Sequence, residues 1–138
     1  EDSRINFYEK LPSLDNNFDI IHLGSSIQYI DDWVKLIQDL GKYNGKYLIF
    51  ADLPASDNDT FVTIQNYYGS KIPVRFWNIK EFITTVESFG YRLVFKARYI
   101  KDSQKKNGFN YIDSINNCFE SNYRLSYFSQ LVFRSNSV

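Results

Sequence analysis

The polar residues best placed for chemistry follow two apolar runs of this sequence. The first run covers residues 18–24, and the second covers residues 45–51. Four polar side chains follow the first run: Ser25, Ser26, Gln28 and Tyr29. Asp52 follows the second run, where its carboxylate could orient an acceptor hydroxyl or act as a general base. The simpler alternatives are a polar turn for the first group and, for Asp52, a carboxylate that caps nearby backbone amides.

A βαβ unit would hold these two polar groups side by side. Both runs are mostly apolar, which is typical of parallel strands that are covered on both faces. Between them, one apolar stripe has helical spacing and consists of Trp33, Leu36, Ile37 and Leu40. Asp31 or Asp32 can cap the start of this helix, and Gly41 is a natural stop. Open α/β sheets bind ligands at the carboxyl ends of their strands, so we expect a crevice beside residues 25–29 and Asp52.

The single histidine and the single cysteine restrict the chemistry that is open to the chain. His22 lies inside the first predicted strand, and we interpret it as a buried core residue, with a catalytic base as the alternative. Cys118 has no second cysteine with which to form an internal disulfide. A zinc site or a histidine-centred proton relay is therefore not expected, and we predict no metal site.

Composition narrows the class of protein further. The length of 138 residues fits a single domain, residues 1–138. Sixteen basic residues balance sixteen acidic ones, which gives no case for a nucleic-acid partner or an anionic membrane surface. No apolar run approaches the roughly 20 residues of a membrane span. The chain begins without a signal-peptide pattern and contains no methionine, so we expect a cytoplasmic protein of which this sequence is a part.

The segments outside the βαβ unit supply further elements. Residues 5–8 form a short apolar run that favours a strand. Residues 60–68 are ambiguous between a helix and irregular structure, and residues 72–77 are predicted to be extended. Asn78 caps a second helix, in which Glu81 completes a pattern similar to a capping box.

The last third of the chain predicts an antiparallel hairpin with a long loop. Residues 91–100 alternate between apolar and polar side chains, which indicates a strand with one wetter face. Residues 125–133 form the last strand and pair with it. The loop between them begins with a polar turn and continues into a short helix or extension within residues 109–122. The turn carries three basic residues, Lys101, Lys105 and Lys106.

Six segments within residues 5–100 carry a family resemblance: FYEKL, FDIIHLGSSIQYI, YLIFADLPAS, TIQNYYG, IPVRFWNIKEF and FGYRLVF. Their order resembles the carboxyl-terminal half of the class I S-adenosylmethionine-dependent methyltransferase fold. Together, the six segments are most similar to a bacterial family of methyltransferase-like proteins often associated with surface-polysaccharide biosynthesis. The resemblance predicts a three-layer, Rossmann-like α/β fold fragment with a mixed sheet and an antiparallel last strand. The family's strand order is 3-2-1-4-5-7-6, and strands 1 and 2 are missing from this sequence.

The resemblance also implies roles for individual residues. Phe7 and Tyr8 would end the third strand, where the adenine ring of the cofactor packs. The polar group of residues 25–29 would border the sulfonium and the methyl acceptor. Asp52 would act on the acceptor, which the resemblance makes a small or sugar-linked molecule. Six more residues could contact or clamp that acceptor: Gln65, Asn66, Tyr67, Tyr68, Arg75 and Trp77.

The glycine-rich cofactor loop of that family has no counterpart in this sequence. None of the six glycines are spaced as GxGxxG, so no loop can bring its backbone close to the cofactor. We therefore assign S-adenosylmethionine to a longer parent enzyme and expect this fragment to be inactive alone. One alternative is a non-catalytic binding or dimerisation module of the same half-fold. Another is a doubly wound domain of unrelated chemistry, because a fold does not determine a function.

An exposed strand edge follows from the missing strands. The strand at residues 18–24 would lie at the edge of the sheet and present unpaired backbone groups. We expect this edge to be covered, either by residues 5–8 or by a second copy of the chain. The second arrangement predicts a homodimer through that edge.

Overall fold

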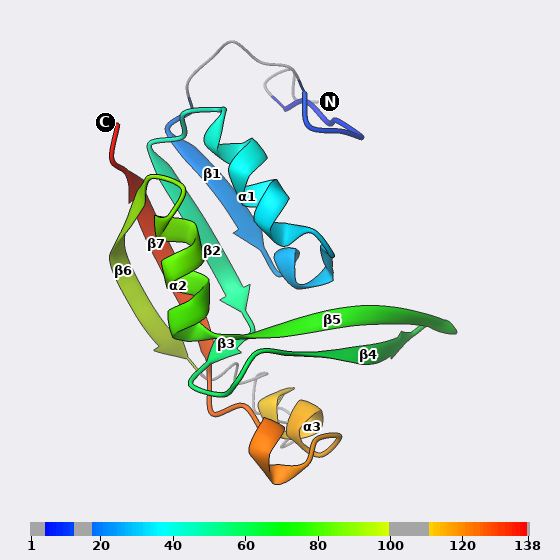
Figure 1. The fold of residues 1–138 in the computed structure, drawn as a ribbon. Coiled ribbons are helices and arrows are strands. Elements are labelled where there is room, and N and C mark those ends of the chain that lie inside the picture. Colours follow the sequence, from blue (N-terminus) through cyan, green and yellow to red (C-terminus); the bar gives the residue numbers. More distant parts are fainter. Residues whose placement is uncertain (1–4, 13–17, 100–110, 138) are drawn as a thin grey trace.

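The main sheet has four strands in the order β1-β2-β7-β6 (Figure 1). The computed structural model describes residues 5–12, 18–99 and 111–137. The strands are β1 (Ile20–Gly24), β2 (Tyr47–Leu53), β7 (Phe128–Ser135) and β6 (Tyr91–Tyr99). β1 and β2 are parallel, whereas β7 runs antiparallel to both β2 and β6. The predicted α/β fold with a mixed sheet, an antiparallel last strand and a long-looped hairpin is therefore confirmed.

The helices α1 (Trp33–Gly41) and α2 (Ile79–Glu87) begin at the capping residues that the sequence predicts. The Asp32 side chain accepts a hydrogen bond from the backbone N–H of Lys35, and Asn78 accepts from the first free amides of α2. Glu81 does not close a direct capping box. Instead, the Asn78 backbone N–H donates to Thr60 Oγ1 at 2.9 Å, and the Thr60 hydroxyl donates to Glu81.

Both helices pack on the same face of the main sheet and enclose the first core, in which Phe82 is the central side chain (Figure 1). The Phe82 ring stacks on Trp33 at a centroid distance of 5.2 Å and meets Phe50 edge-on at 4.9 Å. Burial of side chains of this size stabilises the fold by about 1.5–3 kcal/mol each. The remaining fully buried members include Ile37, Leu48, Val86, Leu131 and Phe133.

The opposite face of the main sheet has no helix packed on it among the described residues. In β1 the exposure alternates, with Ile21 and Leu23 against the core while His22 faces outward and Ile20 is 56% exposed. The described residues thus form two of the three expected layers. The expectation that this strand is covered on both faces and that His22 is a core residue is wrong, because no described segment covers this side of β1.

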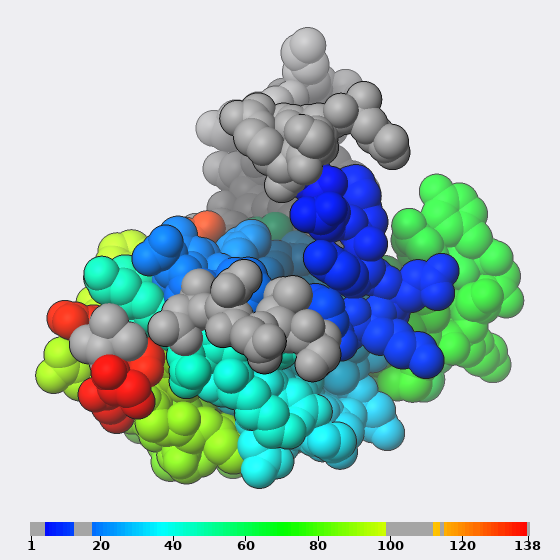
Figure 2. All heavy atoms as spheres, turned by 90° about the horizontal axis from the view of Figure 1, so that it is seen from above, coloured from blue at the N-terminus to red at the C-terminus, as the bar shows by residue number. Residues whose placement is uncertain are grey.

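A second, three-stranded sheet has the order β3-β5-β4 and projects from the base of the first (Figure 1). It consists of β3 (Ala55–Ser56), β4 (Phe61–Tyr67) and β5 (Ser70–Asn78). Tyr68 and Gly69 turn between β4 and β5 with φ of 47° and 81°, as a two-residue hairpin turn requires. In the view from above, this hairpin stands out at one side of the molecule, in green (Figure 2). The prediction of a helix or irregular structure for residues 60–68 is wrong, and that of extended structure for residues 72–77 is confirmed.

The second core lies at the base of this hairpin and is largely aromatic. Phe61 and Phe76 stack at 4.8 Å, and Phe119 meets both rings edge-on. Helix α3 (Tyr111–Asn116) and the short helix η2 (Ser121–Tyr123) flank this cluster. The expected helix within residues 109–122 is therefore present in part, whereas the polar turn with Lys101, Lys105 and Lys106 lies outside the described residues. Other members of the second core are Val74, Ile112, Leu125 and Phe128.

Residues 5–8 do not form the predicted strand. Phe7 and Tyr8 are 89% and 59% exposed, and no described strand pairs with the outer edge of β1. The segment is attached through Pro12, whose carbonyl accepts a hydrogen bond from the Tyr43 hydroxyl. Residues 5–8 therefore do not cover the edge of β1. Among the described residues, none of the helices is long and apolar enough to cross a membrane.

Candidate active site

The structure brings Ser25 and Asp52 together at the carboxyl ends of β1 and β2. Ser25 Oγ donates a hydrogen bond to Asp52 Oδ2 at 2.8 Å, and the Ser25 backbone N–H donates to the carbonyl of Ala51 at 3.0 Å. These two residues lie 27 positions apart in the sequence, so the contact depends on the parallel register of the two strands. The polar residues after β1 and after β2 therefore come into contact, as predicted, through the Ser25–Asp52 hydrogen bond.

Both residues of the pair have a strained backbone. The φ angles are 48° at Ser25 and 54° at Asp52, in the left-handed region that side chains disfavour. Each such residue costs on the order of 1 kcal/mol or more and persists only where its surroundings impose the conformation. Residues of this kind are concentrated at ligand-binding and catalytic sites.

An irregularity in β2 explains how Asp52 reaches Ser25. The pairing of β2 with β7 shifts register between Phe50 and Leu53, and Asp52 lies inside that shift. A bulge of this type redirects a side chain while the strand continues. Leu53 accordingly returns to the first core, where it is fully buried, and the Asp52 carboxylate faces the end of β1.

The short helix η1 (Ile27–Tyr29) carries the rest of the predicted polar group. Gln28 is 9% exposed, and its Oε1 has no hydrogen-bond partner among the described residues. Ser26 is exposed and precedes η1 without a side-chain capping bond. Tyr29 is exposed, and its hydroxyl donates to Gln65 Oε1 of β4 at 3.2 Å.

The β4–β5 hairpin forms a side wall next to η1. Besides the Tyr29–Gln65 bond, Arg75 Nη2 lies 3.7 Å from Asp31 Oδ1, just beyond η1. Asp31 is fully exposed, so this ion pair contributes little to stability. Three of the predicted acceptor residues, Asn66, Tyr67 and Tyr68, lie at or near the exposed hairpin tip.

Trp77 does not clamp a ligand as expected. Its side chain is 2% exposed and packs edge-on against Trp33 and Phe82 in the first core. The reason is the path of β5, which starts at the solvent-exposed hairpin tip and ends between the main sheet and α2. Phe7 and Tyr8 are exposed residues that precede β1 and do not end a described strand.

A second polar cluster at the same edge of the main sheet has no counterpart in the sequence analysis. The Tyr127 hydroxyl donates to Asp57 Oδ2 at 2.8 Å, Arg98 approaches the same oxygen at 3.5 Å, and its guanidinium lies over the Tyr127 ring. Burial raises the pKa of Tyr127, and the hydrogen bond to Asp57 adds to this shift. The three residues come from distant segments, so no local pattern marks them. Their contacts connect three segments of the chain, namely the loop after β3, strand β6 and the segment before β7.

The described glycines do not form a GxGxxG loop of the kind that holds a nucleotide cofactor. Gly45 instead provides room for Ile21, whose Cδ1 would lie 2.6 Å from an added Cβ, and Gly24 lies against the His22 ring. Gly41, Gly69 and Gly90 face open space. Within the described ranges, no cluster of three or more His, Cys, Asp or Glu side chains is arranged to hold a metal ion.

Comparison with known proteins gives matches at the level of structure only. No family model matches the sequence, and neither does any curated protein. A solved structure assigned as an S-adenosylmethionine-dependent methyltransferase of Listeria monocytogenes superposes with a TM-score of 0.59 at 9% identity, over 87% of this chain and 62% of that one. A methyltransferase of the same class from Methanosarcina mazei gives 0.56 at 8% identity, over 89% and 63%.

The chain has the class I methyltransferase fold. The order β1-β2-β7-β6, with an antiparallel β7, agrees with the end 4-5-7-6 of the strand order given above for that fold. The chain spans about three-fifths of the length of the methyltransferase structures that it matches. The cyclase SpnF also shares the fold, with a TM-score of 0.53 at 14% identity, over 91% of this chain and 53% of that one. The reaction therefore has to be argued from the site.

Proposed function

We propose that this chain is the acceptor-side part of an S-adenosylmethionine-dependent methyltransferase. The observation that carries the proposal is the Ser25–Asp52 pair, which lies in strained backbone at the carboxyl edge of a sheet with the methyltransferase strand order. Open α/β sheets bind their ligands at this edge. The resemblance to bacterial proteins of surface-polysaccharide biosynthesis supports a small or sugar-linked acceptor.

In this proposal Asp52 holds the hydroxyl of the acceptor and takes its proton. Methyl transfer depends mainly on the placement of the reacting groups, so a carboxylate held in one orientation is well suited to the task. The Ser25 hydroxyl supplies that orientation by donating to Oδ2. Ser25 is a positioning residue, because it acts through Asp52.

The remaining predicted residues surround the acceptor or the cofactor in the intact enzyme. Tyr29 and Gln65, already joined by a hydrogen bond, form the wall beside the acceptor. Arg75 and Asn66 extend this wall along the hairpin. Ser26 and Gln28 border the reacting groups. Phe7 and Tyr8 stay predicted contacts of the adenine ring, and their exposed rings are available for stacking.

Substitution of Asp52 in the intact methyltransferase tests the proposal. Asp52→Asn keeps the shape and removes the base, so we expect methyl transfer to sugar-linked acceptors to fall by about 10²–10⁴-fold. The matched control is Asp59→Asn, in the exposed loop after β3, which should leave the rate within about twofold. A transfer rate that is the same for both variants contradicts the role of Asp52. Ser25→Ala should lower kcat more than it raises KM.

Calorimetry on the 138-residue chain tests whether the cofactor site is complete. We expect no heat of binding with S-adenosylmethionine, because the described residues supply only the acceptor side of the crevice. Saturating heat at one cofactor per chain would show that the chain holds the cofactor by itself, and the proposal of an inactive part would be wrong. We also place the protein in the cytoplasm, with which its single cysteine is compatible.

The second candidate function is an interaction module that dimerises through β1. The observation that favours it is the outer edge of β1, which has no strand partner in the described part of the chain. A second copy could pair with it around a twofold axis. Light scattering coupled to size-exclusion chromatography measures the mass directly. A monomer at all concentrations up to about 0.1 mM rules out a dimer with a Kd below that value, which corresponds to a binding free energy of roughly −5.5 kcal/mol.

A further inference from the structure

Strand β4 forms an outer edge of the second sheet, and this edge carries no charge. In the order β3-β5-β4, no described strand pairs with the outer side of β4 (Figure 1). The sequence has no charged residue from Thr60 to Ser70, and β4 itself has neither proline nor glycine. Its pairing with β5 runs over seven residue pairs in one continuous register. β4 is therefore a regular, neutral edge of the kind to which a further strand can add.

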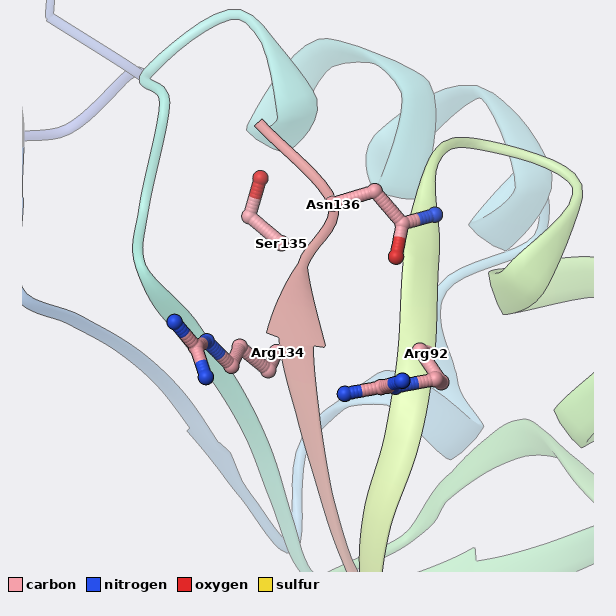
Figure 3. Close-up of a pocket in the computed structure, with 4 residues that line it drawn as sticks. All are labelled: Arg92, Arg134, Ser135 and Asn136. Atoms are coloured by element: carbon pink, nitrogen blue, oxygen red, sulfur yellow. The ribbon is translucent and has the colours of Figure 1, made fainter. Parts of the chain in front are cut away.

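The two edges of the main sheet are less suited to pairing. β6 forms one of them and carries Arg92, Lys96 and Arg98, and its pairing with β7 shifts register between Leu93 and Phe95. Figure 3 shows Arg92 on this strand, where it lines a hollow in the surface. β1 forms the other edge and has only five residues. Charges, bulges and short strands each discourage pairing at an edge, and β4 has none of these features.

The outward backbone groups of β4 belong to residues whose side chains are also exposed. In an antiparallel pair, alternate residues direct their N–H and C=O groups away from the partner strand. The two-residue turn at Tyr68 and Gly69 fixes this alternation, because the residues that flank such a turn pair with each other. Counted from this turn, Val62 and Ile64 direct their backbone groups outward. Their side chains are 54% and 53% exposed, so a partner strand would cover both polar backbone and apolar surface.

We propose that the β4 edge pairs with the β4 edge of a second copy of this chain, antiparallel and around a twofold axis at Thr63. In this register, Val62 of each copy lies opposite Ile64 of its partner, so that four exposed β-branched side chains come together on one face. The two Thr63 side chains meet on the other face, where facing threonines stabilise a pair of strands by hydrogen bonding. The two hairpins then form one continuous sheet, and the twofold axis closes the assembly at two copies.

The chemistry of β4 favours a second copy over a different partner. Like charges that face each other destabilise a pair of strands, and β4 brings no charge to the pair. The whole chain has sixteen basic and sixteen acidic residues, so two copies do not repel each other at long range. A charged partner strand would find no opposite charge on β4. Because β4 has seven residues, fewer than the roughly 20–30 on each side of a standard interface, we expect a weak dimer that depends on concentration.

The β4 edge is separate from the Ser25–Asp52 pair. That pair lies at the ends of β1 and β2 in the main sheet, whereas β4 belongs to the second sheet. The contact of β4 with η1 uses Gln65, whose side chain leaves the strand on the face opposite to that of Ile64. Pairing at the edge therefore leaves the Tyr29–Gln65 bond in place. Neither this proposal nor the proposed methyl transfer depends on the other.

Light scattering coupled to size-exclusion chromatography tests the proposal on the 138-residue chain. Ile64→Lys places a charge of the same sign on both copies at the shared edge, and its position is exposed, so the fold tolerates the change. Ile20→Lys is the matched control, because Ile20 is similarly exposed but lies on β1. We expect the mass of the wild type and of Ile20→Lys to rise with concentration toward that of a dimer. Ile64→Lys should stay monomeric.

Every other outcome overturns the proposal. A wild type that stays monomeric up to about 1 mM does not pair through β4 at any useful strength. A dimer that Ile20→Lys abolishes requires β1, which is the second candidate function. A dimer that survives both substitutions uses a different surface. Masses that grow beyond two copies indicate open-ended stacking of strands instead of a twofold pair.

Disulfide cross-linking tests the register. Thr63→Cys and its control Gln65→Cys are each combined with Cys118→Ser, so that every chain has one thiol. Facing residues of this kind have Cα atoms about 4.5 Å apart, within reach of a disulfide, whereas the two copies of residue 65 would be offset by roughly 13 Å. We expect Thr63→Cys to cross-link at least about tenfold faster under mild oxidation. Equal rates, or a faster Gln65→Cys, overturn the proposed twofold pair.

Discussion

The two cores of this molecule differ in composition, in closure and in the elements that form them. The first core joins two helices to the main sheet, and eight of its side chains, among them Ile37, Phe50 and Phe82, are completely inaccessible to solvent. The second core is a cluster of aromatic rings at the base of the β4–β5 hairpin, and Phe61 and Phe119 at its margin are only half-buried. The difference indicates that the first core determines whether the chain folds, whereas the second determines where the hairpin stands relative to η1.

The largest effect should follow from a cavity in the first core. Phe82→Ala removes a ring that contacts Trp33, Phe50 and Trp77, and we expect a loss of about 3–5 kcal/mol in the free energy of unfolding. Urea denaturation followed by circular dichroism measures this loss. Thr84→Ala, at an exposed position of the same helix, is the control and should change stability by less than about 0.5 kcal/mol.

Phe119→Ala tests whether the second core is a separate unit. Because this ring is half-buried, we expect a loss of roughly 1.5 kcal/mol, about half of the value for a large buried side chain. Hydrogen exchange should accelerate at the amides of β4 and β5 and stay unchanged in α1. Equal acceleration in both regions would mean that the two cores unfold as one unit, and the distinction drawn between them would fail.

The hydrogen bonds that connect the hairpin to α2 should contribute less to the free energy of unfolding than either core does. Thr60→Val removes the hydroxyl that accepts from the Asn78 backbone and donates to Glu81, and we expect a loss of about 0.5–1 kcal/mol. Thr63→Val, at a half-buried position within β4, is the matched control. If both variants lose the same stability in urea titrations, the Thr60 hydroxyl does not stabilise the start of α2.

The smallest effect concerns alkaline pH. Burial raises the pKa of Tyr127 above its usual value of 10, so the folded chain retains the phenol proton more strongly than the unfolded chain does. This contribution to stability is fully present below pH 10 and is lost as the pH rises through the folded-state pKa. Tyr127→Phe should therefore flatten the fall in melting temperature above pH 10. Tyr91, whose pKa burial also raises, is present in both proteins and contributes to the slope that remains.

The first core could be predicted from the sequence because its elements have regular local patterns. The stripe from Trp33 to Leu40 has helical period, Asp32 and Asn78 are strong caps, and the runs before Ser25 and Asp52 are apolar. These signals also located the Ser25–Asp52 contact, since parallel strands bring their carboxyl ends together.

The second core and the hairpin could not be predicted in the same way. Residues 61–67 alternate in exposure, but Thr63 and Gln65 are polar although they lie on the more buried side, which hides the period of two. Trp77 lies near the end of a strand whose other end is in solvent, and its neighbours in the sequence do not reveal where the strand enters the core. The backbone strain at Asp52 depends on a register shift against β7, a strand almost 80 residues further along the chain.

The contact between Trp33 and Trp77 gives the protein a built-in optical probe. These are the only two tryptophans of the chain, and their rings lie 5.4 Å apart within the first core. Tryptophan emission therefore reports the first core alone, while the second core, which contains phenylalanine and tyrosine rings but no tryptophan, contributes nothing when excitation is at 295 nm or above. Unfolding curves from emission and from far-ultraviolet circular dichroism would coincide for a chain that melts in one step. A difference between the midpoints of the two curves would show that the hairpin detaches while the tryptophan pair is still intact.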